Sequence, residues 1–235
     1  MNIITWNCKM AFRNHYNKLL SECPDLLVIP ECENLDYFKD KFYHHALWIG
    51  DNDKKGLGVF SFNNIEIKVH EAYNKEYKYV LPVKIKVHNN PNTINLIAIW
   101  SQNNKVDPKR RYIGEVWNAL NYYKDLLDQS LIIAGDFNWD FNIKQGSSLY
   151  GTFNDVTNLL NKHNIFSAYH VFNNLKFGDE IVQTFFQHHK IEKGHHTDYI
   201  FASNDLMKSM ESFSVGEHKD WYEISDHVPL VMRLK

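Results

Sequence analysis

The stretch LIIAGDFN, residues 131–138, places an apolar run directly before a turn of acidic and amide residues. A short apolar run that ends in turn residues is typical of a buried β-strand. Further runs of this kind occur at residues 3–6, 26–29, 57–62, 94–100, 199–202 and 228–234. Helical spacing of apolar residues predicts helices at residues 14–23, 108–127 and 155–162. The sequence therefore predicts an α/β (α+β) sandwich of two packed sheets with helices outside.

Composition restricts the class of protein. The 235 residues contain no Pro/Gly/Ser-rich linker, so we expect a single domain over residues 1–235. The formal charge of −2 is close to neutral, which restricts any nucleic-acid-binding surface to a local patch. Three cysteines without a CxxC pair favour reduced thiols. With no leader and no long apolar segment in the sequence, we expect a cytoplasmic protein without a membrane span, with a processed secreted form as the alternative. We also expect a monomer.

Acidic, amide and imidazole residues cluster where the expected strands begin or end. They are Asn7, Glu31, Asp136, Asn138, Asp198, Asp226 and His227. A sheet edge can bring such residues together from distant parts of a chain, although each one alone could also be a turn, cap or structural residue. Four carboxylates in one pocket would repel one another, and a bound divalent cation would relieve that repulsion. Oxygen ligands favour Mg²⁺ or Mn²⁺ over zinc.

Five short motifs contain these residues: TWN at 5–7, PE at 30–31, GDFN at 135–138, TDYI at 197–200 and SDHVP at 225–229. In this order they resemble the motifs of the endonuclease/exonuclease/phosphatase superfamily, and the resemblance extends over residues 3–234. It implies a DNase I-like four-layer sandwich, with two packed mixed β-sheets flanked by helices. It also implies a metal-dependent phosphodiesterase or nuclease that uses Mg²⁺ or Mn²⁺ and a metal-assisted water to hydrolyse a P–O bond.

The resemblance implies three residues at the metal. Glu31 would be the principal ligand, and Asn7 and Asp226 would lie beside the ion, directly or through water. One residue departs from the pattern, because some members carry an acidic or amide residue two positions after the asparagine of the WN motif, where this chain has Lys9. Lys9 either points away, or it contacts the substrate phosphate and leaves the ion more dependent on Glu31.

The resemblance also implies which residues move protons. Asp136 would orient and deprotonate the attacking water, with Asn138 hydrogen-bonded to that water or to the phosphate. His227 would contact a non-bridging phosphate oxygen, and Asp198 would hold its ring and favour its protonated form. His196, which precedes the TDYI motif by one residue, is a further candidate for a substrate contact.

A second departure lies at the end of the strand expected at residues 94–100. Several relatives have a His or Tyr there that contacts phosphate, whereas this chain has Trp100. The indole N–H of Trp100 can donate a hydrogen bond but cannot exchange a proton as a histidine does. Asn103, slightly further along, is an alternative polar contact.

The sequence leaves three functions open. The first is a DNA endonuclease or other nuclease, with nucleic acid as the partner. The second is a phosphatase or phosphodiesterase acting on a small phosphorylated metabolite or a lipid head group, because substrate choice depends on loops rather than on the shared pocket. The third is a catalytically inert binding module on the same fold, which Lys9 and Trp100 suggest.

Overall fold

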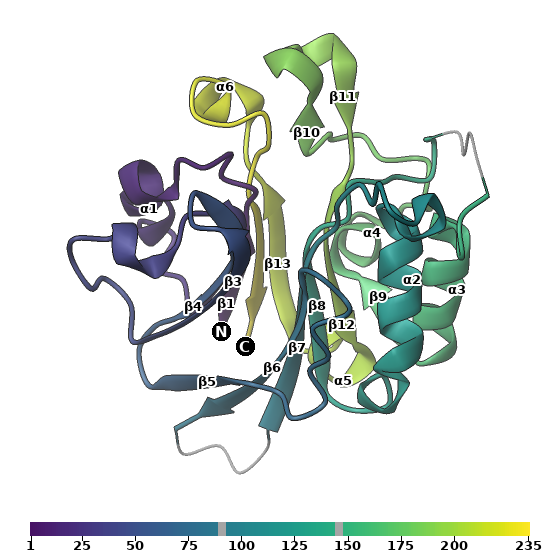
Figure 1. Ribbon diagram of the computed structural model, residues 1–235, viewed down its shortest axis with the longest axis horizontal. Coiled ribbons are helices and arrows are strands. Elements are labelled where there is room, and N and C mark those ends of the chain that lie inside the picture. Colours follow the sequence, from purple (N-terminus) through teal and green to yellow (C-terminus); the bar gives the residue numbers. More distant parts are fainter. Residues whose placement is uncertain (89–92, 144–147) are drawn as a thin grey trace.

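The computed structural model describes residues 1–88, 93–143 and 148–235. These residues form two six-stranded mixed β-sheets with helices on their outer sides (Figure 1), which confirms the predicted sandwich. In order across the sheet, the first consists of β13 (Met210–Val215), β14 (Leu230–Leu234), β1 (Asn2–Thr5), β2 (Leu26–Cys32), β4 (Lys55–Ser61) and β3 (His45–Asn52). The second consists of β5 (Ile65–Val69), β6 (Val80–Val87), β7 (Thr93–Trp100), β8 (Leu131–Asp136), β12 (Asp198–Ser203) and β9 (Ile165–Ser167).

Helices and short turns connect the strands. The α-helices are α1 (Phe12–Leu20), α2 (Ile113–Tyr122), α3 (Phe153–Lys162), α4 (Ala168–Asn173), α5 (Asn204–Met207) and α6 (His218–Trp221). The 3₁₀ turns are η1 (Leu35–Tyr37), η2 (Pro108–Arg110), η3 (Lys124–Leu126), η4 (Gln187–His189) and η5 (Ile191–Lys193). A separate two-stranded hairpin of β10 (Phe185–Phe186) and β11 (Gly194–His195) projects beyond the sheets near α6 (Figure 1). We call residues 185–195 the arm.

Alternating side chains of the strands produce the layers. Ile3 of β1 packs between the sheets with Ile132 of β8, whereas the next residue, Ile4, packs on the outer side with Phe12 of α1. On the outer face of the second sheet, α2 and α3 pack through residues such as Val116. Each fully buried side chain of this size contributes about 1.5–3 kcal/mol relative to exposure. The period-2 pattern of the strands therefore accounts for two sheets with helices on both outer faces.

The direction of the strands brings the candidate residues to one edge. Each sheet contains one parallel pair, β1 with β2 and β7 with β8, so the carboxyl ends of both strands of a pair lie together. β14 is antiparallel to β1, and β12 is antiparallel to β8, which places the first residues of β14 and β12 beside those carboxyl ends. Asp198 pairs with Asp136 in the register of β12 and β8. Residues from six strand ends can therefore meet at one site.

The structure differs from the expected elements at one long helix and at several strands. The expected helix at 108–127 is divided into η2, α2 and η3, because Tyr112 has φ +47° and so cannot continue a helix. The sequence predicts no helix at α4, α5 or α6 and no strand at β3, β5, β6, β9, β10, β11 or β13. Several of them lie at sheet edges and carry polar residues on one face, as in IEIKV of β5, and β6 contains Pro82 and two lysines. Such strands lack the continuous apolar run that marks a buried strand.

The third expected helix begins two residues earlier than the sequence suggested. Thr152 accepts a hydrogen bond from the backbone N–H of Asp155, and the Asp155 carboxylate accepts one from the backbone N–H of Thr152. This capping box fixes the start of α3 at Phe153. No helix formed by the described residues combines the length and the apolar composition needed to cross a bilayer.

Candidate active site

Three buried side chains from different strand ends meet at the edge of the sheets. His227 donates a hydrogen bond from Nδ1 to Oδ2 of Asp198 over 2.8 Å. Its other ring nitrogen, Nε2, lies 4.0 Å from Oδ2 of Asp136. The side chains of Asp136 and Asp198 are completely buried, and that of His227 is nearly so. The imidazole is thus held between two carboxylates.

Two amides hold the Asp136 carboxylate. Asn7 donates from Nδ2 to Oδ2 over 2.9 Å, and Asn138 donates to the same oxygen over 2.9 Å. The backbone N–H of Asn138 donates to Oδ1 over 2.7 Å, in a turn where Asn138 adopts φ +49°. Asn138 also donates to the carbonyl of Ser101 at the end of β7. The GDFN turn therefore fixes the direction of Asp136 through the loops after β1 and β7.

Burial and charge shift the pKa values of this cluster. Burial, and then the charge of Asp198, raise the pKa of Asp136 to about 7, although His227 opposes that shift. Burial alone would lower the pKa of His227, but the carboxylates of Asp198 and Asp136 outweigh it and raise the pKa to about 9. Near neutral pH the site therefore contains an imidazolium and a carboxyl group that readily exchanges a proton.

Thr184, the residue directly before the arm, forms hydrogen bonds with Asp198, and the sequence did not single it out. Its hydroxyl donates to Oδ2 of Asp198 over 2.7 Å and accepts the backbone N–H groups of Thr197 and Asp198, each over 3.0 Å. No described residue provides a hydrogen bond to Oδ1 of Asp198, which is also buried. Thr184 lies 14 residues from Asp198 in a stretch without any motif, so no sequence signal pointed to it.

Phe185 and Ser225 position His227. The Phe185 ring packs against the imidazole with a centroid distance of 4.7 Å. The Ser225 hydroxyl donates to the carbonyl of Asn7 over 2.8 Å and accepts the backbone N–H of His227 over 3.1 Å. Trp6 donates from its indole to the His227 carbonyl. The loop that carries the SDHVP motif is thus fastened to the end of β1.

Asp226 directly precedes His227 in the chain, and Glu31 lies near the end of β2, the parallel neighbour of β1. Glu31 occupies an irregularity in the pairing of β2 with β4 and has φ +60°. The backbone N–H of Cys8 donates to the carbonyl of Pro30 over 3.1 Å, which joins the chain after β1 to the end of β2 just before Glu31. No hydrogen bond or ion pair from another described residue reaches the Glu31 carboxylate. Asp226, by contrast, accepts from the Lys9 ammonium over 3.1 Å.

The arrangement is matched by a family sequence profile. The profile of the endonuclease/exonuclease/phosphatase family covers residues 4–227. The chain belongs to the endonuclease/exonuclease/phosphatase family. No curated protein matches the sequence.

Solved structures of similar fold agree with this assignment. An AP endonuclease from Archaeoglobus fulgidus is 17% identical, with a TM-score of 0.71 over 100% of this chain and 99% of that one. The 3′ phosphatase NExo from Neisseria, bound to a product DNA hairpin, is 15% identical, with a TM-score of 0.69 over 100% and 99%. The AP endonuclease LMAP from Leishmania major is 15% identical, with a TM-score of 0.72 over 100% and 87%. These likenesses show the DNase I-like fold alone.

Members of the endonuclease/exonuclease/phosphatase family are generally metal-dependent phosphoesterases, and two groups of side chains could hold a cation here. Ligand atoms of Asp136, Asp198 and His227 lie within 4.8 Å of one another. A protonated His227 would, however, repel a metal ion placed among them. Glu31 and Asp226 offer carboxylate oxygens on the adjoining strand ends. This second donor set has the oxygen chemistry that Mg²⁺ prefers, and the unengaged Glu31 carboxylate fits a ligand role.

Two residues that the sequence suggested as substrate contacts are buried. Trp100 is 3% exposed, and its ring packs against Tyr79 with a centroid distance of 4.8 Å. His196 is also 3% exposed, donates from Nδ1 to the carbonyl of Val182 and has its pKa lowered by burial. The Lys55 ammonium lies over the Trp100 ring, 5.3 Å from its centroid, and the His196 ring lies 6.0 Å from that of His170. A substrate contact by Trp100 or His196 stays a prediction. Asn103 is exposed and lines a groove of about 480 Å³.

Proposed function

We propose that this protein is a Mg²⁺-dependent phosphoesterase that hydrolyses a P–O bond of DNA by direct attack of water. The observation that carries the proposal is the position of His227 between Asp198 and Asp136. Asp136 is the base and His227 is the imidazolium, and Oδ2 of the one lies 4.0 Å from Nε2 of the other. Both side chains can therefore act on the same phosphate without changing conformation.

Asp136 takes the proton of the attacking water in this proposal. Asn7 and Asn138 direct both oxygens of its carboxylate, and its pKa of about 7 matches the work of a base near neutral pH. General-base catalysis of this kind contributes about 10²–10⁴-fold in rate. The water would be held on the side of Asp136 that faces His227.

His227 stabilises the charge that develops on the phosphate. Asp198 keeps the imidazole protonated and fixes the proton on Nδ1, so that Nε2–H is free to donate to a phosphate oxygen. Loss of one such preorganised donor costs about 10²–10³-fold in rate. Phe185 covers the ring and limits water access to it.

Glu31 and Asp226 would hold Mg²⁺, with Asn7 beside them. When bound, the ion would supply Lewis-acid polarisation of the phosphoryl oxygens and charge neutralisation at the leaving oxygen. Asn7 would then connect the two halves of the site, because its side chain also bonds Asp136.

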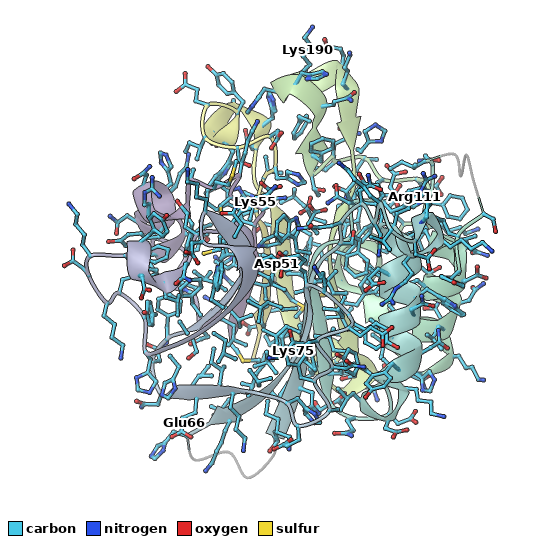
Figure 2. The ribbon with its side chains drawn as sticks, in the orientation of Figure 1. Asp51, Lys55, Glu66, Lys75, Arg111 and Lys190 are labelled. Atoms are coloured by element: carbon cyan, nitrogen blue, oxygen red, sulfur yellow. The ribbon has the colours of Figure 1, made fainter. Side chains whose placement is uncertain are left out.

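DNA is the substrate class that the surroundings favour. The structural neighbours include AP endonucleases and a 3′ phosphatase bound to a DNA hairpin. Figure 2 shows Lys190 at the outer tip of the arm, which projects from the same edge that carries His227. Lys193 adds a second cation to the arm, and both lysines are exposed. With the exposed Glu192 between them, these lysines give the arm a small positive excess, which suits a protein whose total charge is near zero.

A panel assay tests the proposal. Purified protein is incubated with plasmid DNA, single-stranded DNA, RNA, bis-p-nitrophenyl phosphate and inositol phosphates, each with Mg²⁺, Mn²⁺ or EDTA. We expect metal-dependent DNA cleavage that falls at least about 10²-fold in Glu31→Ala and in His227→Ala. Lys208→Met, an exposed residue after α5, serves as the control and keeps full activity.

The other outcomes contradict the proposal in different ways. Turnover of small esters alone would make the protein a phosphatase of small metabolites or head groups. Tight binding of a panel member without turnover would make it a binding module. Wild-type activity in a folded Glu31→Ala or His227→Ala variant would reject the role assigned to that residue.

A further inference from the structure

Lys9 forms an ion pair with Asp226, one of the two carboxylates proposed as metal ligands. Its ammonium lies 3.1 Å from Oδ2 of Asp226 and 2.7 Å from Nε2 of His189 in the arm. The Lys9 side chain is 38% exposed and that of Asp226 is 21% exposed, so the pair is partly shielded from solvent. Since an ammonium group only donates, Nε2 of His189 accepts and its proton lies on Nδ1. One cation thus joins the SDHVP loop to the arm.

The backbone holds Lys9 in this position. Lys9 and Met10 have φ values of +49° and +61°, a conformation that side chains other than glycine rarely adopt. The backbone N–H of Lys9 donates to Oδ1 of Asn7 over 3.1 Å, and the carbonyl of Cys8 accepts the N–H of Ala11. A tight turn therefore directs the side chain toward Asp226 rather than into solvent.

His189 holds the other end of the contact. It too has a positive φ, +60°, and its carbonyl lies 3.2 Å from Nε2 of His218 in α6. This contact joins the arm to α6, and the imidazole of His189 lies beside Lys9. The Lys9 ammonium is consequently held from both sides, by a carboxylate and by a neutral imidazole.

We propose that Lys9 competes with the divalent cation for Asp226, so that the metal binds only when the ammonium moves off this carboxylate. The inference rests on the proposed function, because it concerns the same metal site. A divalent cation and the ammonium compete for this carboxylate, because each is stabilised by its negative charge. Lys9 therefore weakens metal affinity, and the arm, through His189, favours the metal-free arrangement.

Metal binding without substrate tests the inference directly. Free Mn²⁺ is measured by electron paramagnetic resonance during titration of the full chain. Lys9→Met keeps the length of the side chain and removes its charge, and we expect the Kd for Mn²⁺ to fall about tenfold or more. Lys9→Arg keeps the charge and should stay within about twofold of the wild type. Lys208→Met removes a lysine far from the site and should leave the Kd unchanged.

Two further variants locate the effect. In an Asp226→Asn background, Lys9→Met should no longer tighten Mn²⁺ binding, because the contested carboxylate is absent. His189→Gln should tighten binding by less than Lys9→Met, and it keeps the inference testable should Lys9→Met fail to fold. An unchanged or higher Kd in folded Lys9→Met, or tightening that persists with Asp226→Asn, would overturn the inference. Neither result depends on turnover, so the panel assay on the wild type judges the proposed function separately.

Discussion

Replacing Asp198 with Asn should lower the pKa of His227. The change removes the carboxylate 2.8 Å from Nδ1, while the amide oxygen can still accept the hydrogen bond. Burial opposes the imidazolium, and two carboxylates overcome it to give a pKa of about 9. Loss of the nearer one should lower that pKa by about two, which is about 2.7 kcal/mol in the stability of the imidazolium. At pH 8 the protonated fraction would then fall from about nine-tenths to about one-tenth.

The assay is kcat/KM for DNA cleavage as a function of pH. The protonated ring is the active form, so raising the pH through the pKa of His227 removes activity. Wild-type activity should therefore decline near pH 9, and that of Asp198→Asn near about pH 7. Nitrogen NMR of the histidine rings, with His227→Gln for assignment, gives the pKa itself.

A matched control is present in the same chain. Glu180 and His170 form a second buried carboxylate–imidazole pair, 3.0 Å apart, which among the described residues shares no hydrogen bond with His227 or Asp198. Glu180→Gln removes the same kind of charge and should leave the alkaline decline near pH 9. If Asp198→Asn declined at the wild-type pH, the charge argument for His227 would be refuted.

Three other predictions concern stability. Gly135→Ala should destabilise the fold by at least about 3 kcal/mol in urea unfolding, because φ is +142° and a Cβ would lie 1.8 Å from the Ile99 carbonyl oxygen; a smaller loss would mean that β8 can shift. Thr184→Val should lower the free energy of unfolding by about 1–3 kcal/mol and reduce activity, because it removes the hydroxyl that bonds Asp198 and Thr197. Thr184→Ser keeps the hydroxyl and should retain both stability and activity; wild-type behaviour of Thr184→Val would contradict this role. Burial raises the pKa of Glu180, but hydrogen bonds from His170 and Gly178 outweigh it and lower the pKa, so its contribution is present above about pH 4.5 and is lost on acidification. Melting temperatures of Glu180→Gln should fall less between neutral and acid pH than those of the wild type, and parallel curves would contradict this.

The buried centre of the fold was predictable, and its edges were not. β8, β7 and β2 are continuous apolar runs because both of their faces are covered, which makes them visible in the sequence. β5 and β13 bury only alternate residues at sheet edges, so their pattern resembles that of a loop. Their pairing depends on neighbours distant in the chain, which a local pattern does not reveal.

The candidate site was predictable where polar residues end apolar strands. Asp136, Asp198 and His227 were expected to meet, and the register of β8 with β12 places them together. The role of Lys9 was left open because it depends on the direction of a side chain from a strained turn and on His189, 180 residues away. The role of Trp100 stays a prediction, because its position at a strand end says nothing of which face it occupies. Tyr79 fills the space beside it.

Oxygen isotope transfer tests the proposed chemistry most directly. The protein is allowed to cleave a DNA oligonucleotide in H₂¹⁸O with Mg²⁺, and the products are analysed by mass spectrometry. Direct attack of water on phosphorus predicts one ¹⁸O atom in the phosphate group of the product, and no product from Asp136→Asn. A cleaved product whose phosphate contains no ¹⁸O, or cleavage that persists in EDTA, would contradict metal-assisted hydrolysis at this site.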